Sequence, residues 1–264
     1  MELIKQLREM TGAGMVDCKN ALVEAKNDLN LAVEILRKKG IAKAAKRLGR
    51  DAEEGIIKVA VNEAKTEAYI LELNSETDFV ARNEKFTSLA DEIMELIIIQ
   101  KPVDLEALLI LDLKGVSVKD TLANLSGTIG ENLLIKRFAI ISGETVAAYS
   151  HLGGRLGVLI SLDKPSQEVL AMDLAMQVAA ASPKYLVSSE VDKAEMEKEK
   201  EIYKEQLLKE GKPENMVEKI VIGKMGKYYS EVCLVEQEYI KDDKKKVKDI
   251  LGDVNILKFI RYSL

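Results

Sequence analysis

The chain has 264 residues, 47% of them hydrophobic and 31% charged, so it can bury a large core and lies near the length at which one core divides into several domains. Its formal net charge of −5 repels phosphate backbones, and we therefore expect no direct contact with nucleic acid. No apolar run reaches the roughly 20 residues that span a bilayer, and the cysteines, Cys18 and Cys233, show no paired spacing. We therefore expect a cytoplasmic protein without a membrane contact.

Apolar residues at helical spacing predict three short helices in a compact N-terminal module, residues 1–40. A break at residues 11–14 separates the first helix from the second. Asp28 is predicted to cap the start of the third helix and Gly40 to end it. Residues 41–54, which are rich in Ala, Lys and Arg, are predicted to be a linker.

After the linker the apolar period changes from helical spacing to alternation, which predicts a β-hairpin followed by a helix. We place a first subdomain at residues 55–141, in which residues 102–115 fit no class of secondary structure. Its predicted elements are strands at 57–61 and 69–73, a loop at 74–83, helices at 86–97 and 118–130, and a strand at 135–141.

The same order of elements recurs later in the chain, which indicates an internal repeat of two α+β subdomains. We predict that the second subdomain comprises residues 142–186 and 229–264, with an insertion between them. Its predicted elements are strands at 145–149 and 156–162 joined by a turn at 151–155, a helix from residue 166, strands at 231–240 and 256–262, and a short helix at 244–251.

The insertion, residues 187–228, is predicted to be a protruding antiparallel helical hairpin, a short coiled coil. A highly charged run at 190–210 has helical spacing, and the turn residues Gly211-Lys212-Pro213 separate it from a second helical run that starts at Glu214. The predicted fold class is therefore α+β, with an N-terminal three-helix module, two repeated subdomains and a helical hairpin.

The sequence contains no recognisable catalytic or cofactor motif. Because His151 is the single histidine, a metal site built from several histidines is excluded. Any hydrolytic triad that uses a histidine would depend on this residue alone. Gly223-Lys224 lacks the spacing of a phosphate-binding loop, and the glycines at 153–157 lack the spacing of a dinucleotide-binding turn. We therefore expect that the chain is not an enzyme and that it holds no metal, cofactor or nucleotide of its own.

Two residues have both a structural and a functional interpretation. Phe79 follows Asp78 in a polar loop, and an aromatic residue in such a place is either tucked into the core or offered to a partner. Composition alone favours the tucked position. His151 lies at a predicted hairpin turn, where an incidental polar residue is the commoner case.

Several ordered motifs together resemble those of the elongation factor Ts family, and the resemblance covers almost the whole chain. The N-terminal motif, from Leu7 to Leu22, is long enough to be specific. The other motifs are Thr77 to Asn83, Thr128 to Asn132, the hairpin from His151 to Gly157, and the helical hairpin around Gly211-Lys212-Pro213.

The resemblance implies a function in protein biosynthesis, during translation elongation. A member of this family is a guanine-nucleotide exchange factor that binds the GTPase elongation factor Tu in its GDP-bound and nucleotide-free states. The residues that match Asp78 and Phe79 enter a crevice beside the magnesium site of that GTPase, and Thr77 and Val80 flank them. The resemblance also implies a ubiquitin-associated-like fold for the first 40 residues.

Other contacts with the partner are implied by residue-by-residue matches. These residues are Lys19, Arg47, Ile129, Gly130, His151 and Ile240. An alternative function is a non-catalytic adaptor that binds ubiquitin-like or helical partners through its N-terminal module. A second alternative is an enzyme of unrecognised type, which requires His151 to lie among buried carboxylates.

Overall fold

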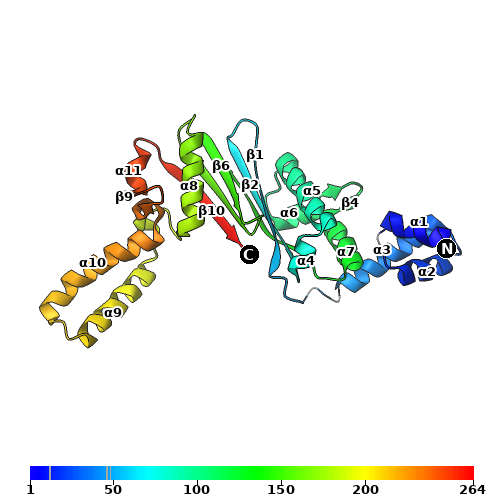
Figure 1. Cartoon of the computed structure of the whole chain (residues 1–264), viewed down its shortest axis with the longest axis horizontal. Coiled ribbons are helices and arrows are strands. Elements are labelled where there is room, and N and C mark those ends of the chain that lie inside the picture. The colour runs from blue at the N-terminus through cyan, green and yellow to red at the C-terminus, as the bar shows by residue number, and fades with distance from the viewer. Residues whose placement is uncertain (12, 46, 48) are drawn as a thin grey trace.

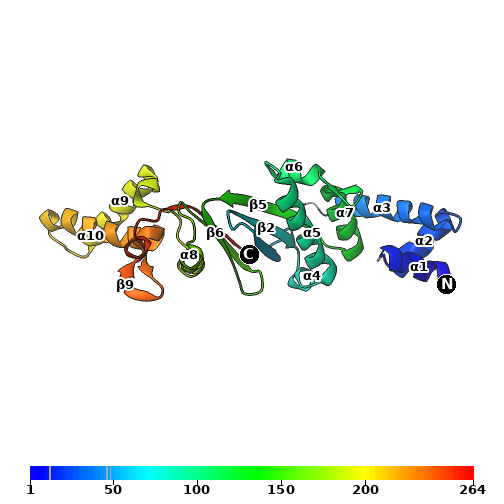
Figure 2. The ribbon, with the colours of Figure 1, turned by 90° about the horizontal axis from the view of Figure 1, so that it is seen from above.

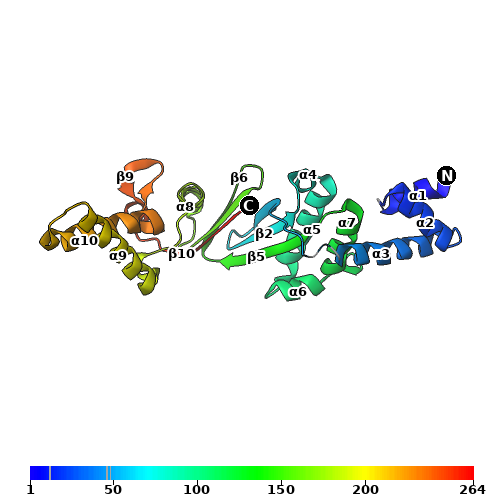
Figure 3. The ribbon, with the colours of Figure 1, turned by 90° about the horizontal axis from the view of Figure 1, so that it is seen from below.

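The computed structural model describes residues 1–11, 13–45, 47 and 49–264. The molecule is elongated, with three N-terminal helices at one end, two β-sheets in the middle and a pair of helices at the other end (Figure 1). The same order along the long axis is visible from above and below (Figures 2 and 3). Helices and strands are mixed along the chain, so the predicted α+β class is confirmed.

The N-terminal helices are α1 (Glu2–Thr11), α2 (Met15–Glu24) and α3 (Leu29–Ala45). They enclose a small core of their own that includes Leu7, Cys18 and Leu22. Asp28 caps α3 as predicted, because its Oδ1 accepts the Leu31 N–H at 3.0 Å. The predicted end of this helix at Gly40 is wrong. A glycine inside a helix costs only about 1 kcal/mol. The helix continues past Gly40 to Ala45, and the Gly40 backbone lies so close to Gly127 that a Cβ on Gly127 would be 2.6 Å from the Gly40 Cα.

The first sheet has the antiparallel order β1-β2-β5. Its strands are β1 (Glu54–Val61), β2 (Glu67–Ser75) and β5 (Leu134–Ser142). Helix α5 (Glu84–Gln100) covers one face of the sheet through its apolar stripe, as the helical spacing predicted. The remaining helices of this half are α4 (Asp78–Ala81), α6 (Leu105–Ile110) and α7 (Val118–Ile129). The unassigned stretch 102–115 contains α6 and β3 (Asp112–Leu113), and β3 pairs with β4 (Val116–Ser117), which follows directly after the stretch.

The second sheet repeats this arrangement, with the antiparallel order β10-β7-β6. Its strands are β6 (Thr145–His151), β7 (Leu156–Leu162) and β10 (Ile256–Ser263). Helix α8 (Glu168–Ala181) packs on its outer face. The two sheets pack on each other through residues that include Ile57, Ile70 and Leu159. Gly157 permits this approach, since a Cβ there would lie 2.6 Å from Ile57 Cγ2.

The distal end is formed by α9 (Lys193–Lys209) and α10 (Glu214–Val232), which pack as an antiparallel pair and project away from the sheets (Figure 1). Gly211, in the turn between them, has a φ of 74° that other residues rarely adopt. The predicted helical hairpin is therefore present in the structure. None of the helices that the structure describes combines the length and the apolar character needed to cross a bilayer.

The predicted strand at 231–240 is wrong for most of its length. Helix α10 continues to Val232, a 3₁₀ turn follows at Leu234–Glu236, and only β8 (Glu238–Tyr239) is extended, paired with β9 (Asp242–Lys246). Glutamine side chains replace a regular ladder: Gln237 Nε2 donates to two backbone carbonyls, and the Ile240 N–H donates to Gln177 Oε1 at 2.8 Å. The last helix, α11 (Val247–Leu251), starts three residues later than predicted.

Candidate functional site

The centre of the candidate site is the single helical turn α4, directly after β2. Thr77 caps this turn, since its side-chain oxygen accepts the Val80 N–H at 3.4 Å. Val80 and Ala81 point into the core, whereas Phe79 is 83% exposed. The turn thus separates inward-facing from outward-facing apolar residues. The tucked position that composition favoured for Phe79 is therefore wrong.

Asp78 lies beside this exposed ring with its carboxylate partly accessible. Its Oδ2 is 2.9 Å from Arg82 Nη2, one helical turn further along. A pair of this kind in water is worth little, so a binding partner can replace Arg82 at a small cost. Arg155, in the turn between β6 and β7, has a raised pKa, mainly because its guanidinium donates to Glu54 and to a smaller extent because of the negative charge of Asp78. The turn of the second sheet is thus joined to the start of β1 by the Arg155–Glu54 contact, at 2.8 Å.

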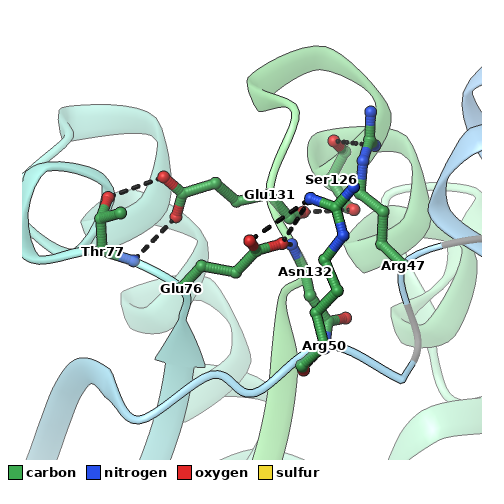
Figure 4. A network of polar contacts seen from close by, with 7 residues as sticks. All are labelled: Arg47, Arg50, Glu76, Thr77, Ser126, Glu131 and Asn132. Carbon is green, nitrogen blue, oxygen red and sulfur yellow. Dashed lines mark hydrogen bonds and ion pairs between the residues drawn. The ribbon is translucent and has the colours of Figure 1, made fainter.

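A network of polar contacts holds the turn from behind (Figure 4). Glu131 accepts from both the backbone N–H and the hydroxyl of Thr77, at 3.0 and 2.6 Å. Glu76 accepts the Asn132 N–H at 2.6 Å and pairs with Arg50. The turn is therefore attached to two segments that are distant in sequence, the chain after α7 and the chain after α3.

Ile129 and Gly130 are brought to the same region by this network. Gly130 ends α7 in the left-handed conformation, with a φ of 95°, and its N–H donates to the Ser126 carbonyl at 2.8 Å. Glu131 follows directly, so its side chain connects the Thr77–Val80 turn with the Ile129–Gly130 pair. Two sets of residues that the sequence predicted separately are therefore neighbours in the fold.

The other predicted contact residues are spread along the molecule. Lys19 lies on the exposed surface of α2, and Ile240 lies between β8 and β9 with 47% of its surface exposed. Arg47 Nη1 donates to the Ser126 carbonyl at 3.1 Å, so this side chain contacts the end of α7. Helix α2, which carries Lys19, and strand β9, which follows Ile240, lie towards opposite ends of the molecule, with α4 between them (Figures 1 and 3).

His151 lies exposed at the end of β6. Its Nδ1 is 2.9 Å from the Tyr149 hydroxyl, and the two rings stack with centroids 5.8 Å apart. This position contradicts the interpretation that placed His151 among buried carboxylates. Within the described ranges of the chain, no group of three or more His, Cys, Asp or Glu side chains is arranged to hold a metal ion.

Sequence reasoning missed the residues that hold the turn. The sequence shows a motif from Thr128 to Asn132, but it indicates no role for Glu131 or Asn132. Glu76 and Arg50 carried no signal at all, because neither lies in an apolar pattern or a catalytic spacing. Their role appears only when residues 26 or more positions apart are brought into contact.

Comparison with known proteins gives the family of the chain. Residues 76–264 match the family model described as Elongation factor TS. Elongation factor Ts of Deinococcus deserti is 45% identical over 264 residues, which cover 100% of this chain and 99% of that protein. Elongation factor Ts of Clostridium perfringens is 44% identical over 275 residues, covering 98% of this chain and 91% of that protein. The Prosthecochloris aestuarii protein of the same name is 44% identical over 278 residues, covering 99% and 96%. The chain therefore belongs to the elongation factor Ts family of translation elongation factors.

Proposed function

We propose that this chain is a guanine-nucleotide exchange factor for elongation factor Tu and acts in the cytoplasm during translation elongation. The observation that carries the proposal is the exposed ring of Phe79 on a capped and braced turn. In the free protein this ring gains nothing from burial, whereas the same apolar surface is stabilising once a partner removes it from water. Buried aromatic anchors of this kind account for much of the binding energy of protein interfaces.

The mechanism that we propose involves no covalent chemistry in this chain. Asp78 and Phe79 enter a crevice beside the magnesium site of the GTPase. Magnesium bridges nucleotide phosphates and protein oxygens, so a disturbance of its coordination removes much of what retains GDP. The chain holds no nucleotide itself; it lowers the affinity of its partner for one.

The exchange cycle then follows from thermodynamic linkage. If the chain binds the nucleotide-free GTPase more tightly than the GDP-bound form, it weakens GDP binding by the same factor. Rebinding of a nucleotide weakens the complex in turn, so cellular GTP releases the factor. Lys19, Arg47, Ile129, Gly130, His151 and Ile240 supply supporting contacts in this proposal, and Thr77 and Val80 frame the central pair.

A second candidate function is an adaptor that binds helical or ubiquitin-like partners through the N-terminal helices. The observation that favours it is a set of exposed apolar side chains on α1 and α2, namely Met10, Met15, Val16 and Val23. Such residues are suited to contact with a partner, although single exposed apolar residues are common on any protein.

One experiment separates the two functions. Elongation factor Tu is loaded with a fluorescent GDP analogue and mixed with excess unlabelled GDP, with and without this chain. We expect the chain to accelerate the fluorescence decay in a concentration-dependent and saturable way. An adaptor leaves the release rate unchanged even where it binds the GTPase.

A further inference from the structure

Glu131 determines how Thr77 caps the Phe79 turn, which is the single helical turn α4 (Asp78–Ala81). A threonine hydroxyl has one proton to donate, and in this structure it goes to Glu131 Oε1 at 2.6 Å. The lone pairs of the same oxygen then face the Val80 N–H, which they accept at 3.4 Å. The second carboxylate oxygen of Glu131 holds the Thr77 N–H at 3.0 Å. A single side chain therefore accepts from both hydrogen-bond donors of the capping residue (Figure 4).

A second group of contacts fixes the position of Glu131 itself. Its backbone carbonyl accepts the Ser126 hydroxyl at 2.5 Å. The next residue, Asn132, donates its N–H to Glu76 at 2.6 Å and its side-chain amide to the Arg50 carbonyl at 2.8 Å. Asn132 is 2% exposed, so its own polar groups are shielded from water. The carboxylate of Glu131 is thus presented from a rigid base.

The Phe79 turn depends on this support because it has little stability of its own. It comprises four residues, fewer than an isolated helix needs to form in water. Its exposed ring makes no use of the core, so the position of the ring depends on the backbone of the turn from which it projects. A turn that is already ordered before binding avoids the entropic cost of ordering on association.

We propose that Glu131 is a positioning residue for the Phe79 turn, which it holds at a fixed spacing from Ile129 and Gly130 by accepting from both hydrogen-bond donors of Thr77. This inference rests on the proposed exchange function for its consequence in activity, but the order of the turn in the free protein is independent of that function. Glu131 is therefore expected to act through Thr77, without a contact of its own to the partner.

The first test measures the order of the turn in the free chain. Backbone amide order parameters and hydrogen exchange of residues 77–81 are compared by NMR between the wild-type chain and Glu131→Ala. We expect the order parameters of the turn to fall from the rigid value of about 0.85 and the Thr77 amide to lose protection. Asp104→Ala is the matched control, because it removes the Ala107 N–H contact that caps α6 in the same half of the molecule. This control should leave residues 77–81 unchanged.

The second test measures exchange. In fluorescent-GDP release from elongation factor Tu, Glu131→Ala should raise the half-saturating concentration of the factor by about tenfold, the scale of lost charge-assisted hydrogen bonds. The double variant Glu131→Ala/Phe79→Ala should have a half-saturating concentration close to that of Phe79→Ala alone, because both substitutions act on the same ring. Glu131→Gln keeps one accepting oxygen and the shape of the side chain, so it should stay closer to wild type than Glu131→Ala.

Two results would overturn the positioning role. One is a Glu131→Ala chain whose order parameters at 77–81 equal those of wild type. The other is a Glu131→Gln chain with an ordered turn and yet the same loss of exchange as Glu131→Ala, since the carboxylate charge would then act on the partner directly. A wild-type chain that does not accelerate GDP release would refute the proposed exchange function, and the NMR measurement would still decide the role of Glu131.

Discussion

Gly127 on α7 lies so close to Gly40 on α3 that a Cβ on Gly127 would be 2.6 Å from the Gly40 Cα and 2.9 Å from the Gly40 carbonyl. The relationship is asymmetric, because a Cβ on Gly40 would be 3.8 Å from the Gly127 Cα, an ordinary contact distance. The N-terminal helices therefore lie against the rest of the molecule at a crossing that one methyl group on α7 would disturb.

Gly127→Ala should accordingly displace α3 from α7, at a cost of about 1–3 kcal/mol as for other overpacked contacts. We expect a lower melting temperature and a changed radius of gyration in small-angle X-ray scattering. Gly40→Ala is the matched control, because it adds the same methyl group to the same crossing with room to spare and improves helix propensity by about 1 kcal/mol. Equal melting temperatures and equal scattering for the two variants would contradict this interpretation.

We propose that residues 1–40 form a separate domain, joined by a linker at 41–54 to two subdomains at 55–141 and at 142–186 with 229–264, and that 187–228 form a hairpin domain. Deletion of residues 1–50 should then leave a folded remainder, because the sheets and their covering helices have their own buried clusters. The fragment should bind elongation factor Tu weakly, since it lacks Lys19 and the Arg50 contact to Glu76. A circular dichroism spectrum of an unfolded chain would refute the proposed boundary.

The sequence predicted the sheets well because alternation of apolar residues is a local signal. Ile57 and Val59 face the second sheet, where a Cβ on Gly157 would meet both, and their spacing alone identified the first strand. Prediction was wrong where a distant contact outweighed a local preference. Gly40 has the properties of a helix terminator, yet α7 packs against it, and the stretch before Ile240 alternates like a strand, yet glutamine side chains bind its backbone.

The helical hairpin should be dispensable for folding. Its distal apolar residues, Leu207, Val217 and Val221, pack within the hairpin cluster and make no part of the clusters at the sheets. Replacement of residues 200–224 by a short Gly-Ser turn should therefore leave the thermal transition of the sheets in place. Tyr185 and Cys233 are retained in this variant, because the β-bridge between them joins the base of the hairpin to the rest of the molecule. Loss of the whole transition in calorimetry would show that the hairpin supports the core.

The base of the hairpin should loosen in acid. Glu195 accepts from the hydroxyls of Tyr185 and Tyr228, each at 2.6 Å, and these bonds, that of Tyr185 first, lower the pKa of the Glu195 carboxyl. A carboxyl group whose pKa is lower in the folded chain than in the unfolded chain stabilises the fold. This contribution is complete at pH values above the ordinary carboxyl pKa, and it is lost as the pH falls through the lowered pKa. The NMR signals of the two tyrosine rings should therefore shift as the pH falls below about 4.5.

Glu195→Gln is the control for this acid titration. Its side chain has no proton to gain, so the shift of the Tyr185 and Tyr228 signals should flatten while other carboxyl groups titrate as before. An unchanged titration curve in Glu195→Gln would assign the acid effect to another group.

The candidate site was predictable only in part. The Asp78-Phe79 pair stood out in sequence because few phenylalanines occur and this one lies in a polar loop. Whether the ring is buried could not be decided locally, because its exposure follows from a cap on Thr77 that is held by Glu131, 54 positions away. A motif can mark such a residue, but only the fold shows which side chain supports it.

The ring of Phe79 is 83% exposed, so its effects on folding and on binding can be separated. Phe79→Ala should change the stability of the free chain by no more than about 0.5 kcal/mol, as for other surface substitutions. The complex with elongation factor Tu should weaken by about 2 kcal/mol or more, which is roughly a 30-fold rise in the dissociation constant. Phe86→Ala is the matched control: this ring is fully buried, so its loss should cost about 3–5 kcal/mol of stability through cavity formation.

Asp78→Ala should weaken the complex in the same direction as Phe79→Ala. The double variant should lose less binding free energy than the sum of the two single variants, because neighbours in one crevice share partners. A melting curve for each free variant beside a GDP-release titration checks all of these. A Phe79→Ala chain that melts like wild type and still releases GDP at the wild-type rate would remove the ring from the mechanism.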